Sequence, residues 1–369
     1  MSKPMAAADT IRIDVASSRG AYPVLVGAGS LSALPRLLGD MDLADAVTVV
    51  SCSPVWRLHA RRLRGVRAAR TPVLIPDGER AKTLATVARI YDALLARRMD
   101  RSGTLLAFGG GVVGDVAGFA AASYLRGIRL VQIPTTVLAQ VDSAIGGKVG
   151  VNLPKGKNLV GAFHPPSLVV CDPAVLASLS AREFRSGFYE VVKYGVIASR
   201  PLFDRVARNL AALFDRDTAI LTTVIADCCA IKADVVGRDE REAGPRRALN
   251  FGHTIGHALE AITHYRRFRH GEAIGWGMLA AARLSAMRGL LHTEDEARLQ
   301  TLIAAMGPLP AVSDLRVGDA LDAIGHDKKV SKGRLHFVLA DGIGSTTTID
   351  DASGPELKAA MRSIGLRAT

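Results

Sequence analysis

The sequence lacks several features that would define whole classes of protein. It has only four cysteines, Cys52, Cys171, Cys228 and Cys229, and no two of them have Cys-x-x-Cys spacing, which argues against a disulfide framework or a cysteine zinc site. No uncharged apolar run approaches the roughly 18 residues that cross a bilayer. The first ten residues contain no apolar segment typical of a secretory signal. We therefore expect a cytosolic protein.

Charge is unevenly balanced. Lys and Arg total 47 against 35 Asp and Glu, which leaves a formal net charge of +12. Such a protein can bind nucleic acid, an anionic membrane surface or a phosphorylated small molecule. The densest arginine run extends over residues 57–70, and no aromatic residue after Trp56 is interleaved with it to stack on bases. We interpret this run as a solvated helix face, so we expect no nucleic-acid and no membrane partner.

Length and apolar pattern predict two domains. The chain has 369 residues, of which 49% are hydrophobic. Up to about residue 175, short β-branched runs alternate with helical stretches, a pattern typical of an α/β fold with a mostly parallel sheet. Beyond that point apolar residues recur at helical spacing. We expect an α/β domain over residues 1–178 and a mainly helical domain over residues 179–369. The predicted strands are 23–27, 47–51, 73–76, 104–108, 128–133 and 168–171.

A glycine-rich segment, Gly109-Gly-Gly-Val-Val-Gly-Asp115, follows one predicted strand and precedes an apolar helix. Glycines allow a pyrophosphate to approach the free N–H groups at a helix N-terminus. A tight structural turn is the alternative, because the segment lies near the fourth strand and no acid follows about twenty residues later. Polar turns after two other strands, at Asp77–Lys82 and Pro134–Thr136, favour dinucleotide binding, since strand ends meet at one edge of a parallel sheet.

Histidines cluster in the second half. Four of the nine lie within eighteen residues, and His253 and His257 are four residues apart on one face of a predicted helix. His270 is expected in a basic loop ahead of a further helix. Two histidines from separate elements and one carboxylate would make the open three-ligand site of a catalytic metal. Glu190 is the candidate, because a charge on an otherwise apolar helix face is costly unless it is paired or bound to metal. The alternative is histidines satisfied in the core or exposed, which we expect for His264.

Several basic residues stand singly beside glycine, proline or apolar residues. We expect Lys148 and Lys157 to lie in glycine-rich loops, which suit a phosphate, although any one of these cations could form an ordinary salt bridge. Considered with the glycine-rich segment and the histidines, they indicate a small anionic substrate beside a nucleotide. The isolated cations are Arg126, Lys148, Lys157, Lys193, Lys232, Arg246 and Lys328.

A series of ordered segments resembles the 3-dehydroquinate synthases of the sugar phosphate cyclase family, and the likeness extends from about residue 22 to 343. This resemblance implies an α/β N-terminal domain that binds NAD, an all-α C-terminal domain that binds metal and substrate, one divalent ion (zinc, or cobalt) and a homodimer. The segments are GGGVVGDVAGF (109–119), YLRG (124–127), QIPTTVLAQVDSAIGGKVGVN (132–152), GKNLVGAFHPP (156–166), SGFYEVVKYG (186–195), LNFGHTIGHALE (249–260), HGEAIGWGM (270–278) and HDKK (326–329).

The resemblance also implies roles for single residues. Glu190, His253 and His270 match the metal ligands, and His257 and Glu242 match the residues assigned to proton transfer. Arg126 matches an arginine that reaches the substrate phosphate from the partner subunit. The other implied substrate-binding or catalytic positions are Asp142, Lys148, Asn158, Lys193, Lys232, Arg246, Asn250 and Lys328, and Lys329 could exchange roles with Lys328.

The positions that match NAD contacts fall mostly at strand ends. One departure concerns Cys52, which stands where the family commonly has an acid that holds the adenosine ribose. A thiol cannot accept that pair of hydrogen bonds, so we expect the ribose to be bound more weakly or differently. The implied NAD contacts are Asp77, Gly78, Glu79, Arg80, Ala81, Lys82, Gly111, Val112, Val113, Gly114, Asp115, Thr135, Thr136, Lys148, Lys157, Val175, Leu176, Ala177 and Ser178.

The implied reaction converts 3-deoxy-D-arabino-heptulosonate 7-phosphate to 3-dehydroquinate and phosphate, a shikimate-pathway step towards chorismate and the aromatic amino acids. It proceeds through transient oxidation by NAD, phosphate elimination, re-reduction, ring opening and intramolecular aldol closure. One alternative is another sugar phosphate cyclase, of the aminodehydroquinate or deoxy-scyllo-inosose synthase type, although Lys232 with Arg246 favours a substrate that has a carboxylate. A glycerol dehydrogenase-like polyol dehydrogenase is a further alternative, which would lack the lysine-containing glycine segments.

Overall fold

The computed structural model describes residues 10–154, 156–242, 244–325, 330–331 and 334–368. The chain divides into two compact units, Met1–Ser180 with Arg216–Arg241 and Ala181–Asp215 with Glu242–Thr369. We expected a single domain boundary, after residue 178. The observed division differs because helix α8 (Thr218–Arg238) belongs to the first unit, where it packs against strands β1 and β2. No helix in the described part of the chain is long and apolar enough to cross a membrane.

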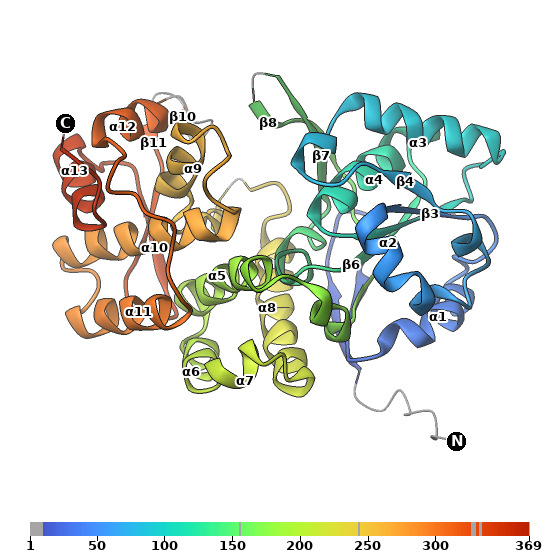
Figure 1. Cartoon of the computed structure of the whole chain (residues 1–369), viewed down its shortest axis with the longest axis horizontal. Helices are drawn as coiled ribbons and strands as arrows, with labels where there is room; N and C mark the ends of the chain where they lie inside the picture. Colours follow the sequence, from blue (N-terminus) through green and yellow to red (C-terminus); the bar gives the residue numbers. More distant parts are fainter. Residues whose placement is uncertain (1–9, 155, 243, 326–329, 332–333, 369) are drawn as a thin grey trace. The chain divides into compact units, whose positions relative to one another are not determined.

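The first unit is built on a seven-stranded sheet with the order β1-β2-β9-β6-β5-β3-β4 (Figure 1). β1 pairs antiparallel with β2, and the other neighbouring strands pair in parallel. The predicted mostly parallel sheet is thereby confirmed, and the carboxyl ends of its parallel strands lie along one edge. The strands are β1 (Ile11–Val15), β2 (Tyr22–Val26), β3 (Val47–Cys52), β4 (Val73–Ile75), β5 (Thr104–Gly109), β6 (Arg129–Pro134) and β9 (Leu168–Cys171).

Two helices cover the central strands with apolar side chains. Val87 and Ile90 of α3 and Val116 of α4 share a buried cluster with Leu105 of β5. α8 packs on β1 and β2. The remaining first-unit elements are α1 (Leu34–Asp40), α2 (Ser53–His59), α3 (Leu84–Ala96), α4 (Gly111–Ser123), the 3-10 turns η1 (Ser30–Ala33), η2 (Ala60–Leu63), η3 (Arg67–Arg70), η4 (Glu79–Ala81), η5 (Tyr124–Arg126) and η7 (Pro173–Ser178), and the π-helical η6 (Ala139–Ser143).

The lysine-containing glycine segments around residue 150 form an antiparallel hairpin, β7 (Lys148–Leu153) with β8 (Gly156–Phe163), where the sequence analysis expected loops. The reason lies in the side chains of β7. Val149 and Val151 are buried, and a Cβ atom at Gly118 of α4 would lie 2.3 Å from the side chain of Val149. The small residue on α4 therefore allows the hairpin to pack against that helix.

The second unit is mainly helical, as predicted. α10 packs against α5, α9, α11 and α13, and Figure 1 shows α9 and α10 side by side. Two short antiparallel pairs, β10 (Val330–Ser331) with β11 (Arg334–Leu335) and β12 (Phe337–Ala340) with β13 (Thr346–Ile349), are added to the helices. The helical elements are α5 (Ala181–Ala198), α6 (Arg200–Arg208), α7 (Leu210–Phe214), η8 (Pro245–Asn250), α9 (His253–Ile262), α10 (His270–Met287), α11 (Thr293–Ala305), α12 (Val317–Gly325) and α13 (Gly354–Ser363).

Candidate metal centre and nucleotide site

The candidate metal centre begins with Glu190 on α5, whose side chain is 0% exposed. Lys193, one turn later, forms an ion pair with Oε2 of Glu190. The other oxygen, Oε1, accepts no hydrogen bond from any residue that the structure describes. A buried carboxylate with so little compensation is costly, so this position favours a further cation.

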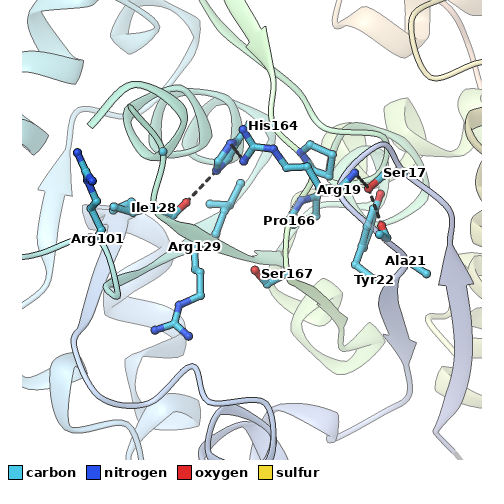
Figure 2. A pocket seen from close by; sticks show the side chains of 14 residues that line it. Ser17, Arg19, Ala21, Tyr22, Arg101, Ile128, Arg129, His164, Pro166 and Ser167 are labelled. Atoms are coloured by element: carbon cyan, nitrogen blue, oxygen red, sulfur yellow. Dashed lines mark hydrogen bonds between the residues drawn. The ribbon is translucent and has the colours of Figure 1, made fainter. Parts of the chain in front are cut away.

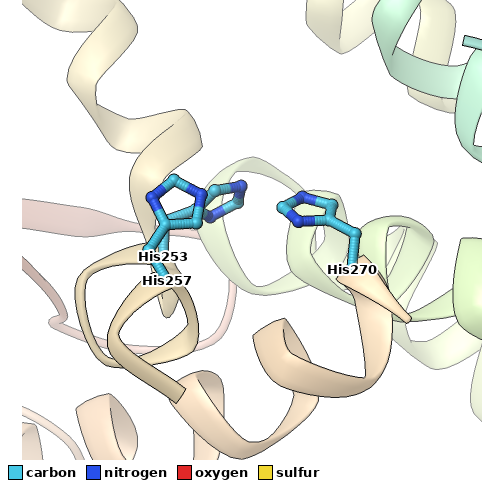
Figure 3. Close-up of side chains that lie close together, drawn as sticks. All are labelled: His253, His257 and His270. Atoms are coloured by element: carbon cyan, nitrogen blue, oxygen red, sulfur yellow. The ribbon is translucent and has the colours of Figure 1, made fainter. Parts of the chain in front are cut away.

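Three imidazoles converge beside Glu190. His253 and His257 come from α9, and the ring of His270, the first residue of α10, points towards them from the neighbouring helix (Figure 3). One ligand atom from each imidazole lies within 4.8 Å of the others. The Nε2 atoms of His253 and His270 each lie 3.6 Å from Oε1 of Glu190. The predicted cluster is therefore brought together, whereas His264 is exposed, as expected.

Two glycines explain how the helices come close enough to form this centre. A Cβ atom at Gly271 would lie 1.7 Å from the carbonyl oxygen of Ser186 on α5, and one at Gly277 would lie 1.8 Å from the carbonyl oxygen of Gly252. Any larger residue at these positions would separate α10 from α5 and from the start of α9. The glycines beside the histidines thus have a packing function.

The contacts of Nδ1 indicate the tautomer of the two imidazoles. Nδ1 of His253 lies 3.1 Å from the carbonyl oxygen of Phe251, and Nδ1 of His270 lies 3.4 Å from Oε2 of Glu260. A carbonyl or a carboxylate can only accept, so each neutral ring donates from Nδ1 and carries a lone pair on Nε2. These two lone pairs face Oε1 of Glu190, and the three groups repel one another unless a cation lies between them.

The spacing of these atoms suits a divalent ion. Zinc binds nitrogen and oxygen at about 2.0–2.2 Å in tetrahedral geometry, which places its ligands about 3.3–3.6 Å apart.

Burial lowers the pKa of His270, but the hydrogen bond and charge of Glu260 and the charge of Glu190 raise it more, so this pKa is raised overall. The imidazole is therefore more basic than an ordinary histidine side chain.

Sequence reasoning missed Glu260, which the structure brings against His270. A signal was present. Glu260 follows His253 by seven residues, so both lie on one face of α9, and its neighbours Ala258 and Leu259 are buried. The argument that singled out Glu190, a charge on an apolar helix face, applies equally to Glu260.

The 3-10 turn η8 presents two other predicted residues of this unit. It packs against α5, the helix that bears Glu190. Arg246 is buried, and the side-chain amide of Asn250 donates to Oε1 of Glu242 at 2.6 Å. Glu242 has a φ of 63°, a left-handed conformation that non-glycine residues adopt at a cost and that is often found at functional sites.

In the first unit, the glycine-rich segment leads from β5 directly into α4. The N-cap residue Gly110 provides no side-chain cap, so the first turn of α4 keeps free N–H groups. A Cβ atom at Gly114 would lie 2.9 Å from Oε1 of Gln132, so this glycine permits close packing of helix and sheet. At the end of β6, the buried hydroxyl of Thr135 has no hydrogen-bond partner among the described residues. Free amides, a helix N-terminus and an open hydroxyl fit a pyrophosphate group.

Lys82, in the polar turn after β4, contacts both α4 and the β7–β8 hairpin. Its ammonium pairs with Asp115 and donates to the side chain of Asn158. The side-chain amide of Asn152, on β7, donates to Oε1 of Glu79 at 2.7 Å. Burial raises the pKa of Asp115, and the positive charge of Lys82 opposes that shift. The β7–β8 hairpin therefore packs against the turn, and Asn158, predicted to bind substrate, contacts Lys82, which was predicted to contact NAD.

The position of the missing ribose acid has a nearby substitute. Cys52 ends β3, the strand beside β5, which is where a dinucleotide fold carries that acid. The thiol is buried, and burial, together with the nearby carboxylate of Asp77, raises the pKa of Cys52. Asp77, which follows the adjacent strand β4, thus brings a carboxylate to the end of β3.

The remaining predicted residues take varied positions. Asp142 on η6 forms an ion pair with Lys232 of α8 inside the first unit. Lys148 and Arg126 are exposed, and Arg126 has a φ of 67°. Val175–Ser178 lie in η7, just after the carboxyl end of β9. Lys328 and Lys329 lie outside the described residues.

A separate cavity of about 400 Å³ lies in the first unit, at the amino ends of β2, β6 and β9. Its lining includes Arg19, Arg129 and His164 but none of the described residues predicted for either site. Figure 2 shows Arg19 beside His164, whose Nε2 contacts the carbonyl oxygen of Ile128 at 2.9 Å. Arg129 donates to two backbone carbonyls instead of facing a ligand. We assign no function to this cavity.

The chain is similar in sequence to known protein families. The family described as 3-dehydroquinate synthase N-terminal matches residues 72–186, and the family described as 3-dehydroquinate synthase C-terminal matches residues 187–330. A 3-dehydroquinate synthase from Citrifermentans bemidjiense is 45% identical over 340 residues, which cover 90% of this chain and 93% of that relative.

Solved structures of similar proteins share the fold over nearly the whole chain. A 2-epi-5-epi-valiolone synthase from Streptomyces hygroscopicus subsp. jinggangensis 5008, with NAD⁺ and Zn²⁺ bound, has a TM-score of 0.82 and 29% identity and covers 93% of this chain and 96% of its own. A 2-deoxy-scyllo-inosose synthase with carbaglucose-6-phosphate, NAD⁺ and Co²⁺ has a TM-score of 0.82 and 27% identity and covers 96% of this chain and 100% of its own.

Proposed function

The chain belongs to the 3-dehydroquinate synthase family of carbon–oxygen lyases acting on phosphate, and from this premise we propose how its residues divide the work. The reaction is the conversion of 3-deoxy-D-arabino-heptulosonate 7-phosphate to 3-dehydroquinate and phosphate. The observation that carries the proposal is the buried carboxylate of Glu190, 3.6 Å from the Nε2 atoms of two histidines. The first unit binds NAD, and the second binds the metal and much of the substrate.

Glu190, His253 and His270 hold a divalent ion, zinc or cobalt. This ion supplies Lewis-acid polarisation of a substrate oxygen. The half-buried His257 lies in the same cluster but is left out of the ligand set, because Glu190 has the greater need for a cation. An imidazole with an ordinary pKa near 6.5 can relay protons at neutral pH, and we assign that role to His257. Glu242, held by Asn250, is the second proton-transfer group.

NAD lies at the carboxyl edge of the parallel sheet. It supplies a hydride acceptor that is regenerated in each turnover, so no net oxidation occurs. The N–H groups at the start of α4 bind its pyrophosphate, and Lys82 stays anchored between Asp115 and Asn158. Asp77 accepts from the ribose in place of an acid at Cys52. The two similar solved enzymes that contain NAD⁺ with Zn²⁺ or Co²⁺ support both cofactors.

The substrate is an anionic sugar phosphate, and cations bind its two charged ends. Arg246, buried in η8, and Lys232, held by Asp142, bind the carboxylate. The phosphate contacts are assigned to Lys148, Asn158 and, from the partner subunit of a homodimer, the position of Arg126. The exposed, left-handed Arg126 supports that role, because it projects from the surface of its own unit. Lys193, Asn250 and Lys328 complete the set.

We place the enzyme in the cytoplasm, because NAD and small sugar phosphates are cytoplasmic metabolites. The alternative cyclases and polyol dehydrogenases are not favoured, since the 45% identical relative is a 3-dehydroquinate synthase.

The decisive experiment measures phosphate released from the heptulosonate phosphate, with and without a chelator and with and without added NAD. We expect release that needs both, that zinc or cobalt restores after chelation, and that is absent with glucose 6-phosphate, which has no carboxylate. Reduction of NAD⁺ by glycerol in stoichiometric amounts, with no phosphate released, would overturn the assignment.

A further inference from the structure

Glu260 is a buried carboxylate on the same helix as two of the clustered histidines. His253, His257 and Glu260 follow one another at four- and three-residue steps, so they share one face of α9. The side chain of Glu260 is 5% exposed, and its Oε2 atom lies 3.4 Å from Nδ1 of His270 on α10. Glu260 thereby connects the two helices that supply the imidazoles.

Other buried glutamates of the second unit have different partners. Glu272 accepts from Arg182 and from the backbone N–H of Arg269, and so caps the start of α10. Glu296 contacts Arg283 and Gln300. Among these three carboxylates, Glu260 is the one that contacts an imidazole of the metal centre. Its place is therefore difficult to explain by helix capping or by surface ion pairing.

The two metal-ligand histidines also differ in their support. Nδ1 of His253 donates to a neutral carbonyl, that of Phe251, whereas Nδ1 of His270 donates to a carboxylate. A charged acceptor forms the stronger hydrogen bond and makes the opposite ring nitrogen more basic. Both histidines are the first residues of their helices, but the side chain of His270 is 32% exposed against 10% for His253, so His270 has the greater need for an external restraint.

We propose that Glu260 is a positioning residue of the metal centre. By accepting the Nδ1–H of His270, it fixes the tautomer and the orientation of the ring, so that the Nε2 lone pair faces Oε1 of Glu190. The inference rests on the proposed function, because it assumes that these groups bind a divalent ion. It assigns Glu260 no contact with substrate or NAD.

The experiment compares the zinc affinity of wild type with that of three variants. Each is purified as the full-length protein and stripped of metal, and its affinity is measured by competition with a chromophoric chelator. Glu260→Ala removes the acceptor, and Glu260→Gln keeps an acceptor but removes the charge. Glu296→Gln is the matched control, because Glu296 is also 5% exposed in this unit but contacts no imidazole in the described structure. Loss of the group that orients a metal-bound histidine weakens metal binding roughly 10–100-fold. We expect that loss for Glu260→Ala, a smaller loss for Glu260→Gln and none for the control.

A spectroscopic readout separates positioning from a purely structural effect. The visible absorption bands of the cobalt-loaded protein report the ligand field, and we expect them to shift in both Glu260 variants but not in Glu296→Gln. The thermal midpoint of the metal-free protein should change similarly in Glu260→Gln and Glu296→Gln.

Equal zinc affinity in wild type and Glu260→Ala would overturn the inference alone and leave the proposed function standing. An unshifted cobalt spectrum, with affinity lost only in proportion to stability of the metal-free protein, would also overturn it. A wild-type protein that binds no zinc would overturn the proposed function with it.

Discussion

Nε2 of His270 lies 3.6 Å from Oε1 of Glu190, although the two residues come from different helices and are eighty positions apart in the sequence. The distance is too long for a hydrogen bond, and the Nδ1–H of the ring already points to Glu260. Two electron-rich atoms therefore face each other at the separation of two ligands of one ion. This relationship supports the proposal that the second unit binds the metal.

Replacement of His270 tests that relationship. We expect His270→Ala to lose most of its bound metal, because the change leaves two of three ligands, while the fold persists because the residue lies at the start of α10. Metal content by elemental analysis and far-ultraviolet circular dichroism provide the measurement. His264→Ala is the control, since His264 is exposed. Undiminished metal and turnover in His270→Ala would remove this residue from the ligand set.

Replacement of Asp77 tests the proposed substitute for the ribose acid. We expect Asp77→Asn to raise the dissociation constant of NAD roughly tenfold, since hydrogen bonds to charged groups contribute about 1.5–3 kcal/mol and the amide keeps part of the contact. Fluorescence titration with NAD measures it. Cys52→Ser keeps a donor to Asp77 and should bind NAD nearly as well as wild type. If Cys52→Ser weakens binding and Asp77→Asn does not, the acceptor has been assigned to the wrong residue.

Arg246 provides a test of substrate recognition. We expect Arg246→Ala to raise KM for the heptulosonate phosphate roughly 10–100-fold, because a charge-assisted contact to the carboxylate is lost. Arg246→Lys keeps the charge without the bidentate geometry, so we expect its KM to lie between those of wild type and Arg246→Ala. Steady-state kinetics measure the effect, with the adjacent Arg247→Ala as control, and a thermal melt checks that removing a buried arginine has not unfolded the unit. Unchanged kinetics would contradict the carboxylate assignment.

Much of this arrangement could be predicted from local patterns. Glycines after β5 and polar turns after β4 and β6 indicated one edge of a parallel sheet, because strand direction alone decides where such ends meet. The spacing of His253 and His257 likewise placed both on one helix face. These inferences needed only periodicity and chain order.

Features that depend on long-range packing could not be predicted in this way. α8 has the apolar spacing of any buried helix, and nothing in its sequence states that it packs on β1 and β2. The contact between Cys52 and Asp77 depends on the parallel pairing of β3 with β4. The β7–β8 hairpin was missed because its glycines resembled a loop, whereas Gly150 and Gly161 allow the two strands to approach closely.

The last prediction concerns acid stability of the second unit. Arg288, the C-cap residue of α10, donates to both carboxylate oxygens of Glu356 on α13, at 2.7 and 2.9 Å, and this contact, with Ser353, lowers the pKa of Glu356 to about 2. A carboxyl group with a lowered pKa stabilises the fold above its unfolded pKa of about 4.3, and that stabilisation is lost as the pH falls towards 2. Glu356→Gln keeps the capping pair with Ser353 but removes the charge. We expect it to cost about 1–2 kcal/mol at pH 7 and only about a quarter of that near pH 2.5, measured by calorimetry on metal-free protein. A difference that stays constant between these pH values would show that Glu356 acts through packing and not through its charge.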